Sequence, residues 1–271
     1  MKYVQLGCLL FLAISLLSAC QKVIHLDLKP SDQPYVIEGI VTDQPGTCRV
    51  LISRTKQFAD DNSFQGVSGA EVTLADDAGD TVRLVERGAG VYTDSMFIGA
   101  TGHRYALQVT VGGKRFTASS TMSSKVRLDS AYIAEEDFFG DATKQLNVMY
   151  QDPAGQPDYY KFVEFVNGVQ VQQLFVGDDQ LTDGKEVTST LRYFDDKDNK
   201  NDVPKIKTGD TIKVNMECID AAVYKYWSSL ESSATGSSQS ASPANPVTNI
   251  AGGALGYFSA YTLQQKVIIA P

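Results

Sequence analysis

The stretch Arg104–Ala118 (RYALQVTVGGKRFTA) decides the fold, because two strand-like runs flank a pair of glycines. In its first half every second side chain is apolar, namely Tyr105, Leu107, Val109 and Val111. This alternation is typical of a β-strand with one buried face. Gly112 and Gly113 can both adopt the positive φ angles that a two-residue hairpin turn requires. We therefore expect an antiparallel β-hairpin here.

Similar runs, separated by turn residues, continue on both sides of this hairpin. They are Tyr35–Val41, Arg49–Ser53, Glu71–Ala75, Thr81–Glu86, Val126–Ile133, Gln145–Gln151, Tyr159–Asn167, Val169–Val176, Val187–Phe194, Thr211–Met216, Leu255–Tyr261 and Gln265–Ala270. Short strands at this spacing indicate β-sandwiches. A Ser-rich stretch at 119–124 marks a boundary between them. The predicted fold is mainly β, with two β-sandwich-like domains in tandem at 35–122 and 125–271.

One segment departs from the β pattern. Asp220–Ser232 (DAAVYKYWSSLES) places Val223, Tyr226, Trp227 and Leu230 at helical spacings of three and four. Asp220 is a favourable residue for the helix N-cap. We expect one short helix near 220–232, in the second domain.

The first twenty residues indicate export and lipidation. Lys2 precedes a mostly apolar stretch that has the length of a secretory signal. Leu17-Ser18-Ala19-Cys20 follows it and resembles the bacterial lipobox. The resemblance implies a signal peptide at 1–19, acylation of Cys20, and a lipid-anchored tether at 20–34. Because Gln21 is not acidic, we expect the outer membrane and leave the leaflet open.

The net charge and the low numbers of histidine and cysteine argue against several classes of function. The formal net charge is −8 and the pI is about 4.8, which disfavours nucleic acid as a partner. The chain has 2 His and 4 Cys, with neither a CxxC motif nor a Cys-His zinc spacing. We expect no cofactor, no metal and no enzymatic activity.

Two resemblances follow from particular motifs. Val67–Leu74, Gly90–Tyr92 and Gly102–Leu107 resemble the transthyretin-like, or carboxypeptidase-regulatory-like, β-sandwich.

The lipobox, Tyr35–Gly39, Tyr224–Trp227 and Asn245–Phe258 resemble the domain of unknown function 4249 lipoproteins of Gram-negative bacteria. This resemblance implies a cell-envelope protein, often found beside TonB-dependent outer-membrane receptors.

Candidate catalytic groups are few. His25 lies in the expected tether and His103 in an expected turn, and the chain has no Gly-x-Ser-x-Gly motif. Carboxylates that a glycosidase could use are Glu135, Glu136, Asp137 and Glu164. Glu164 shares a strand face with apolar side chains, so it either faces a polar cavity or marks an exposed side. Asp195–Asp202 lacks the glycine and the glutamate of an EF-hand.

Cys48 and Cys218 leave two alternatives open, a disulfide or two buried free thiols. Tyr224, Trp227, Tyr257 and Phe258 are the candidate binding surface. We expect the helix aromatics to pack against the second sandwich; a partner-docking face would instead leave some of these rings in solvent. We expect a non-catalytic outer-membrane lipoprotein that binds a ligand or partner and assists a TonB-dependent receptor. The alternatives are an adhesin or envelope scaffold and, third, a polysaccharide hydrolase.

Overall fold

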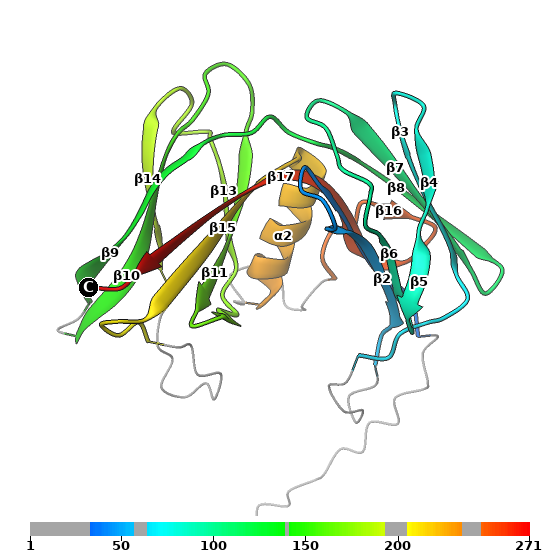
Figure 1. Cartoon of the computed structure of the whole chain (residues 1–271), viewed down its shortest axis with the longest axis horizontal. Helices are drawn as coiled ribbons and strands as arrows, with labels where there is room; N and C mark the ends of the chain where they lie inside the picture. Colours follow the sequence, from blue (N-terminus) through cyan, green and yellow to red (C-terminus); the bar gives the residue numbers. More distant parts are fainter. Residues whose placement is uncertain (1–32, 57–63, 139–140, 193–204, 235–244) are drawn as a thin grey trace, which may run out of the picture. The chain divides into compact units, whose positions relative to one another are not determined.

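The computed structural model in Figure 1 describes residues 33–56, 64–138, 141–192, 205–234 and 245–271. The expected signal peptide, Cys20, His25 and the segment Asp195–Asp202 lie outside these residues. From Pro34 to Pro271 the chain forms one compact unit. The described residues are mainly β-strand with a single short helix, which confirms the predicted fold class.

The first hydrophobic core lies between two sheets. One layer contains β1 (Tyr35–Thr42), β2 (Cys48–Arg54), β6 (Val91–Asp94), β5 (Val85–Gly88) and the first half of β17 (Leu255–Ile269). The other contains β16 (Ile250–Ala251), β8 (Lys114–Thr121), β7 (Arg104–Val111), β3 (Glu71–Asp76) and β4 (Thr81–Arg83). The β7–β8 hairpin forms as expected, and Tyr105, Leu107, Val109 and Val111 all enter this core.

The second hydrophobic core lies between two other groups of strands. One is the sheet of β14 (Glu186–Leu191), β10 (Asp141–Gln151) and β9 (Leu128–Phe138). The other contains β12 (Val169–Gln170), β11 (Tyr159–Val166), β13 (Phe175–Asp178), β15 (Thr211–Ile219) and the second half of β17. The alternating side chains of β10, β11 and β15 fill this core, for example Leu146, Phe162 and Val214.

The strand β17, red in Figure 1, belongs to the layers around both cores. Residues Leu255–Tyr261 pair in parallel with β1, and residues Thr262–Ile269 pair antiparallel with β15. The prediction of two separate strands, Leu255–Tyr261 and Gln265–Ala270, is wrong, because β17 runs without a break from Leu255 to Ile269. The polar Gln264 is accommodated in a single 15-residue strand because its Oε1 accepts a hydrogen bond from Leu128 N at 3.2 Å.

The predicted boundary at 122–125 coincides with the passage from β8 to β9, between the two cores. The C-terminal segment nevertheless returns to the first core, where Ile250, Ala254, Phe258 and Ala260 are buried. Close packing of β17 on β1 depends on Gly256, which has φ +94°, since a Cβ atom there would lie 2.1 Å from Ile37 O. The segment 125–271 therefore contributes to both cores.

The helix α2 (Ala221–Ala234) begins after Asp220, as the sequence predicts. Asp220 Oδ1 accepts a hydrogen bond from Val223 N at 2.9 Å, which is the N-cap geometry. Its other oxygen, Oδ2, accepts from Ser120 Oγ at 2.6 Å and from Thr121 N at 3.0 Å. One carboxylate thus holds the start of the helix against the end of β8.

We predict that Asp220→Ala lowers the free energy of unfolding by about 2–3 kcal/mol. The variant loses the cap and leaves the buried Ser120 hydroxyl without its acceptor. Urea unfolding measures the change. Asp220→Asn is the matched control, because it keeps an oxygen acceptor and should lose less than half as much. A loss below about 0.5 kcal/mol for the alanine variant would contradict this account of the cap.

Candidate functional site

The expected binding surface is only partly exposed. Phe258 is fully buried in the first core, with an exposed fraction of 0%, so the prediction is wrong for this residue. The alternation of β17 directs Phe258 inward and Tyr257 to the opposite face, toward α2. Tyr224, Trp227 and Tyr257 are half-buried.

Aromatic rings join α2 to the neighbouring sheet. The Trp227 ring centroid lies 4.8 Å from that of Tyr257 and 5.2 Å from that of Tyr226. Lys161 Nζ lies 4.7 Å from the Trp227 centroid and 2.8 Å from Glu217 Oε2. Such cation–π and edge-to-face contacts stabilise packing. These contacts agree with the packing alternative for the helix aromatics.

The two cysteines are free, buried thiols. Cys48 belongs to the first core and Cys218 to the second, so the structure does not pair them. Burial raises the pKa of Cys48 to about 12, with the Asp94 carboxylate adding to the effect. A thiol with such a pKa is a poor nucleophile at neutral pH. Of the two alternatives, the structure has the free thiols.

His103 lies at the surface turn that the sequence predicts, where its Nδ1 is 3.0 Å from Asp77 Oδ1. The ring therefore contacts carboxylates at the end of a sheet. This arrangement is a polar contact at the surface.

Glu164 occupies the inner face of β11, within the second core. Its exposed fraction is 0%, and neither carboxylate oxygen has a hydrogen-bond partner. Burial away from water raises its pKa to about 8. The expectation of a polar cavity or an exposed side is wrong, because Glu164 lies among apolar side chains such as Phe162 and Val166. It is a protonated, structural acid at neutral pH.

A surface cavity of about 430 Å³ lies beside β9, β10 and the second half of β17. Its lining residues are Arg127, Leu128, Asp129, Met149, Glu186 and Lys266. The volume is within the range of small-molecule sites. Arg127 and Asp129 form an ion pair with each other at its rim.

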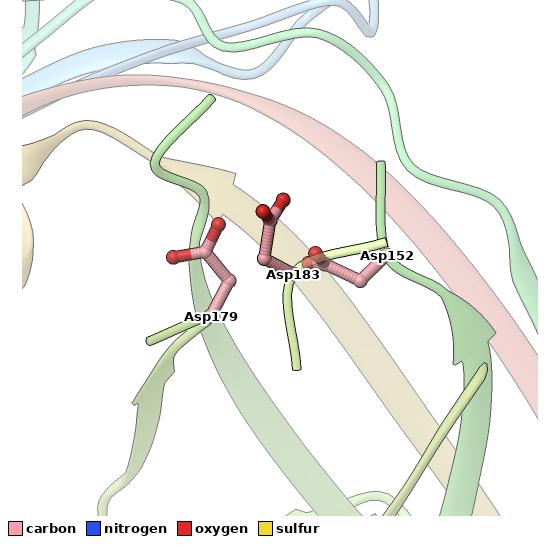
Figure 2. Close-up of side chains that lie close together, drawn as sticks. All are labelled: Asp152, Asp179 and Asp183. Atoms are coloured by element: carbon pink, nitrogen blue, oxygen red, sulfur yellow. The ribbon is translucent and has the colours of Figure 1, made fainter. Parts of the chain in front are cut away.

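Three aspartate side chains lie close together in the second sandwich, as Figure 2 shows. Asp152 follows β10 directly, and Asp179 and Asp183 lie in the turn between β13 and β14. One carboxylate oxygen from each lies within 4.8 Å of those from the other two. Asp152 and Asp179 are only 1% and 6% exposed, whereas Asp183 is exposed. The sequence analysis missed this cluster.

Hydrogen bonds hold two of the three side chains in place. Tyr160 Oη donates to Asp152 Oδ1, and Gly184 N donates to Asp152 Oδ2 at 3.3 Å. Gly155 N donates to Asp183 Oδ1 at 2.7 Å. The cluster therefore links the turn after β10 to the turn before β14.

The negative charge of the three aspartates affects the pKa of a fourth, neighbouring acid, Asp158. Partial burial, together with the carboxylates of Asp152, Asp179 and Asp183, raises the pKa of Asp158 to about 6. Oxygen-rich groups of this kind are the ligands that hard cations such as Ca²⁺ and Mg²⁺ prefer. Of all the described residues, this cluster has the donor set best suited to bind an ion.

The sequence suggested metal binding by carboxylates only at Asp195–Asp202, which lies outside the described residues. The sequence contains only a weak indication of the aspartate cluster. Asp179 and Asp183 are four residues apart in a polar turn, and Asp152 follows a strand-like run. Nothing local connects Asp152 with the turn near Asp179. Their proximity depends on the pairing of β10 with β14, in which Gln151 lies opposite Glu186.

The fold and this group of carboxylates define a β-sandwich protein with an acidic cluster between two turns. The chain belongs to the family described as Domain of unknown function (DUF4249), whose match covers residues 21–267. The predicted membership is therefore confirmed. A search of the curated proteins gives no match. Among the described residues we find no helix with the length and apolar character needed to cross a bilayer.

The buried acid predicts a pH-dependent stability. Between pH 4.5 and about 8 the folded state keeps the Glu164 proton that the unfolded state has lost. Raising the pH through this window should lower the free energy of unfolding by about 1.4 kcal/mol per unit. Glu164→Gln should remove that slope in urea unfolding measured from pH 5 to pH 8.

The exposed Glu71 offers a matched control, since Glu71→Gln should keep the pH slope of the wild type. Parallel pH profiles for the wild type and Glu164→Gln would show that Glu164 is not protonated in the folded state.

Proposed function

We propose that the protein is a non-catalytic lipoprotein of the outer membrane, and that it binds a ligand or partner in support of a TonB-dependent receptor. The observation that carries the proposal is the sequence Leu17-Ser18-Ala19-Cys20 after an apolar stretch. Acyl chains on Cys20 would supply the two or more hydrophobic anchors that stable membrane attachment requires. The family membership is compatible with this role and names no activity.

The position of the first strand supports the anchoring proposal. The strand β1 begins at Tyr35, so residues 21–34 separate the anchor from the folded unit. A chain of that length spans at most roughly 50 Å when fully extended. Such a tether would let the β-sandwich unit contact a neighbouring membrane protein while it stays attached to the lipid.

The acidic cluster argues against the polysaccharide hydrolase alternative. A glycosidase needs two carboxyl groups that face the same sugar. Asp152 and Asp179 are buried, so a polymer cannot contact both of them from outside. Glu164 is likewise enclosed by the second core. These three buried carboxylates are therefore not placed to act on a polymer.

Replacement of the anchor residue tests the localisation. We predict that Cys20→Ala abolishes incorporation of labelled palmitate and releases the protein from the outer-membrane fraction. Cys8→Ala is the matched control, because this thiol lies within the expected signal peptide and should leave labelling unchanged. Labelling of the Cys20→Ala protein at the wild-type level would refute the lipobox assignment.

Association with a receptor tests the partner. We predict that the tagged, lipidated protein co-purifies with a TonB-dependent receptor encoded beside its gene, after solubilisation in mild detergent. A second outer-membrane lipoprotein carrying the same tag serves as the control bait. If the receptor is present in the membrane and neither bait retains it, the accessory role is wrong and the adhesin or scaffold alternative gains support.

A further inference from the structure

The surface cavity of the second sandwich contains two charged side chains of opposite sign that are not paired with each other. Glu186 of β14 and Lys266 of β17 both line this cavity of about 430 Å³. Neither forms a salt bridge with any described residue. Opposite charges that share a cavity attract each other, so their separation shows that the two strands hold them on different walls.

The other lining residues supply an apolar surface and a pair of charges that is already formed. Arg127 is occupied by Asp129, with which it forms an ion pair. Leu128 is buried and Met149 is half-buried beside them. Apolar surface with a few polar groups is typical of small-molecule sites. The cavity therefore fits a ligand that carries one positive group, one negative group and an apolar part.

A β-bulge shapes the wall of the cavity that β9 forms. Met149 lies opposite Ser130. The next residue of β10, Tyr150, lies opposite Leu128, so Asp129 is an extra residue in β9. An extra residue of this kind bends the strand and interrupts its regular hydrogen bonding. Because β9 is also the edge strand of its sheet, the cavity lies where regular strand pairing ends.

The strand that carries Lys266 has a free edge beside the cavity. The second half of β17 pairs with β15 on one side and, among the described residues, with no strand on the other. Ala270 N donates to Asp210 O on the β15 side. Since the backbone groups of a strand point alternately to its two sides, those of Gln265 and Val267 face the free edge. Such an edge can add an extended peptide through main-chain hydrogen bonds.

We propose that this cavity binds a short peptide with free termini. Glu186 pairs with the amino terminus of the peptide and Lys266 with its carboxylate, through charge-assisted hydrogen bonds. Leu128 and Met149 contact an apolar side chain, and the free edge of β17 supplies main-chain hydrogen bonds. This assignment rests on the binding role proposed above and names the class of ligand.

Calorimetric titration of the full-length protein in mild detergent with the tripeptide Ala-Leu-Ala tests the site. Binding should be saturable, with one peptide per chain. The N-acetylated and the C-amidated peptides should each bind at least about 10-fold more weakly, because each lacks one of the two charges. No saturable binding of the free tripeptide up to about 10 mM would overturn the site. Equal affinity for a peptide blocked at both ends would overturn the two charge contacts.

Free leucine separates a peptide site from an amino-acid site. It carries both charges but has no peptide groups to pair with the edge of β17. We therefore expect leucine to bind at least about 10-fold more weakly than Ala-Leu-Ala. Equal affinities for leucine and the tripeptide would overturn the role of the β17 edge.

Variants assign each end of the peptide to one residue. Glu186→Gln should bind the N-acetylated and free peptides alike, and Lys266→Met should bind the C-amidated and free peptides alike, because each lacks the charge that recognises that end. Glu71→Gln and Lys114→Met are the matched controls, since both residues are exposed on strands of the first sandwich. Both controls should bind as the wild type does. Wild-type affinity and wild-type discrimination in both cavity variants would contradict the proposal.

This titration contains neither a membrane nor a receptor. Its failure would therefore remove the peptide site and leave the anchoring and the receptor association to the palmitate and co-purification experiments.

Discussion

Both hydrophobic cores depend on one strand, β17, which changes its hydrogen-bonding partner midway along its length. Its first half pairs in parallel with β1 and its second half antiparallel with β15, so a single ribbon of 15 residues completes a layer over each core. At the change of partner, Leu263 N donates to Asp43 Oδ1 at 2.9 Å, and Gln264 bonds to the chain that leads into β9. These bonds satisfy backbone and side-chain groups that would otherwise be buried without partners. The strand keeps its hydrogen bonds as it passes from one core to the next.

Carboxylates that are wholly or partly buried have different roles in this unit because their surroundings differ. Asp220 is surrounded by hydrogen-bond donors and joins α2 to β8. Glu164 has apolar neighbours and keeps its proton at neutral pH, as its pKa near 8 indicates. Asp152 lies beside two other acids, Asp179 and Asp183, and accepts hydrogen bonds from Tyr160 Oη and Gly184 N. A residue type alone therefore says little about function until its solvation and neighbours are known.

Several local features could be predicted from the sequence. The alternation in Arg104–Val111 and the glycine pair after it predicted the β7–β8 hairpin, and the spacing of Val223 and Tyr226 predicted α2. The prediction that Phe258 lies on an exposed binding surface was wrong, because this side chain is fully buried. The alternation of side chains along a strand separates its two faces, but it does not indicate which face is covered by another sheet. The aspartate cluster was missed because Asp152 and Asp179 approach each other only through the β10–β14 pairing.

The sequence by itself determined the helix and the approximate position of most strands, the family, and the lipobox on which the anchoring proposal depends. Those features are encoded in side chains that are neighbours along the chain, through periodicity, turn residues and motifs. Only the tertiary structure decided that β17 serves two cores, that Cys48 and Cys218 lie in separate cores, and that three aspartates converge. These features depend on contacts between residues far apart in sequence, which form when apolar faces are buried against each other and which no local pattern records.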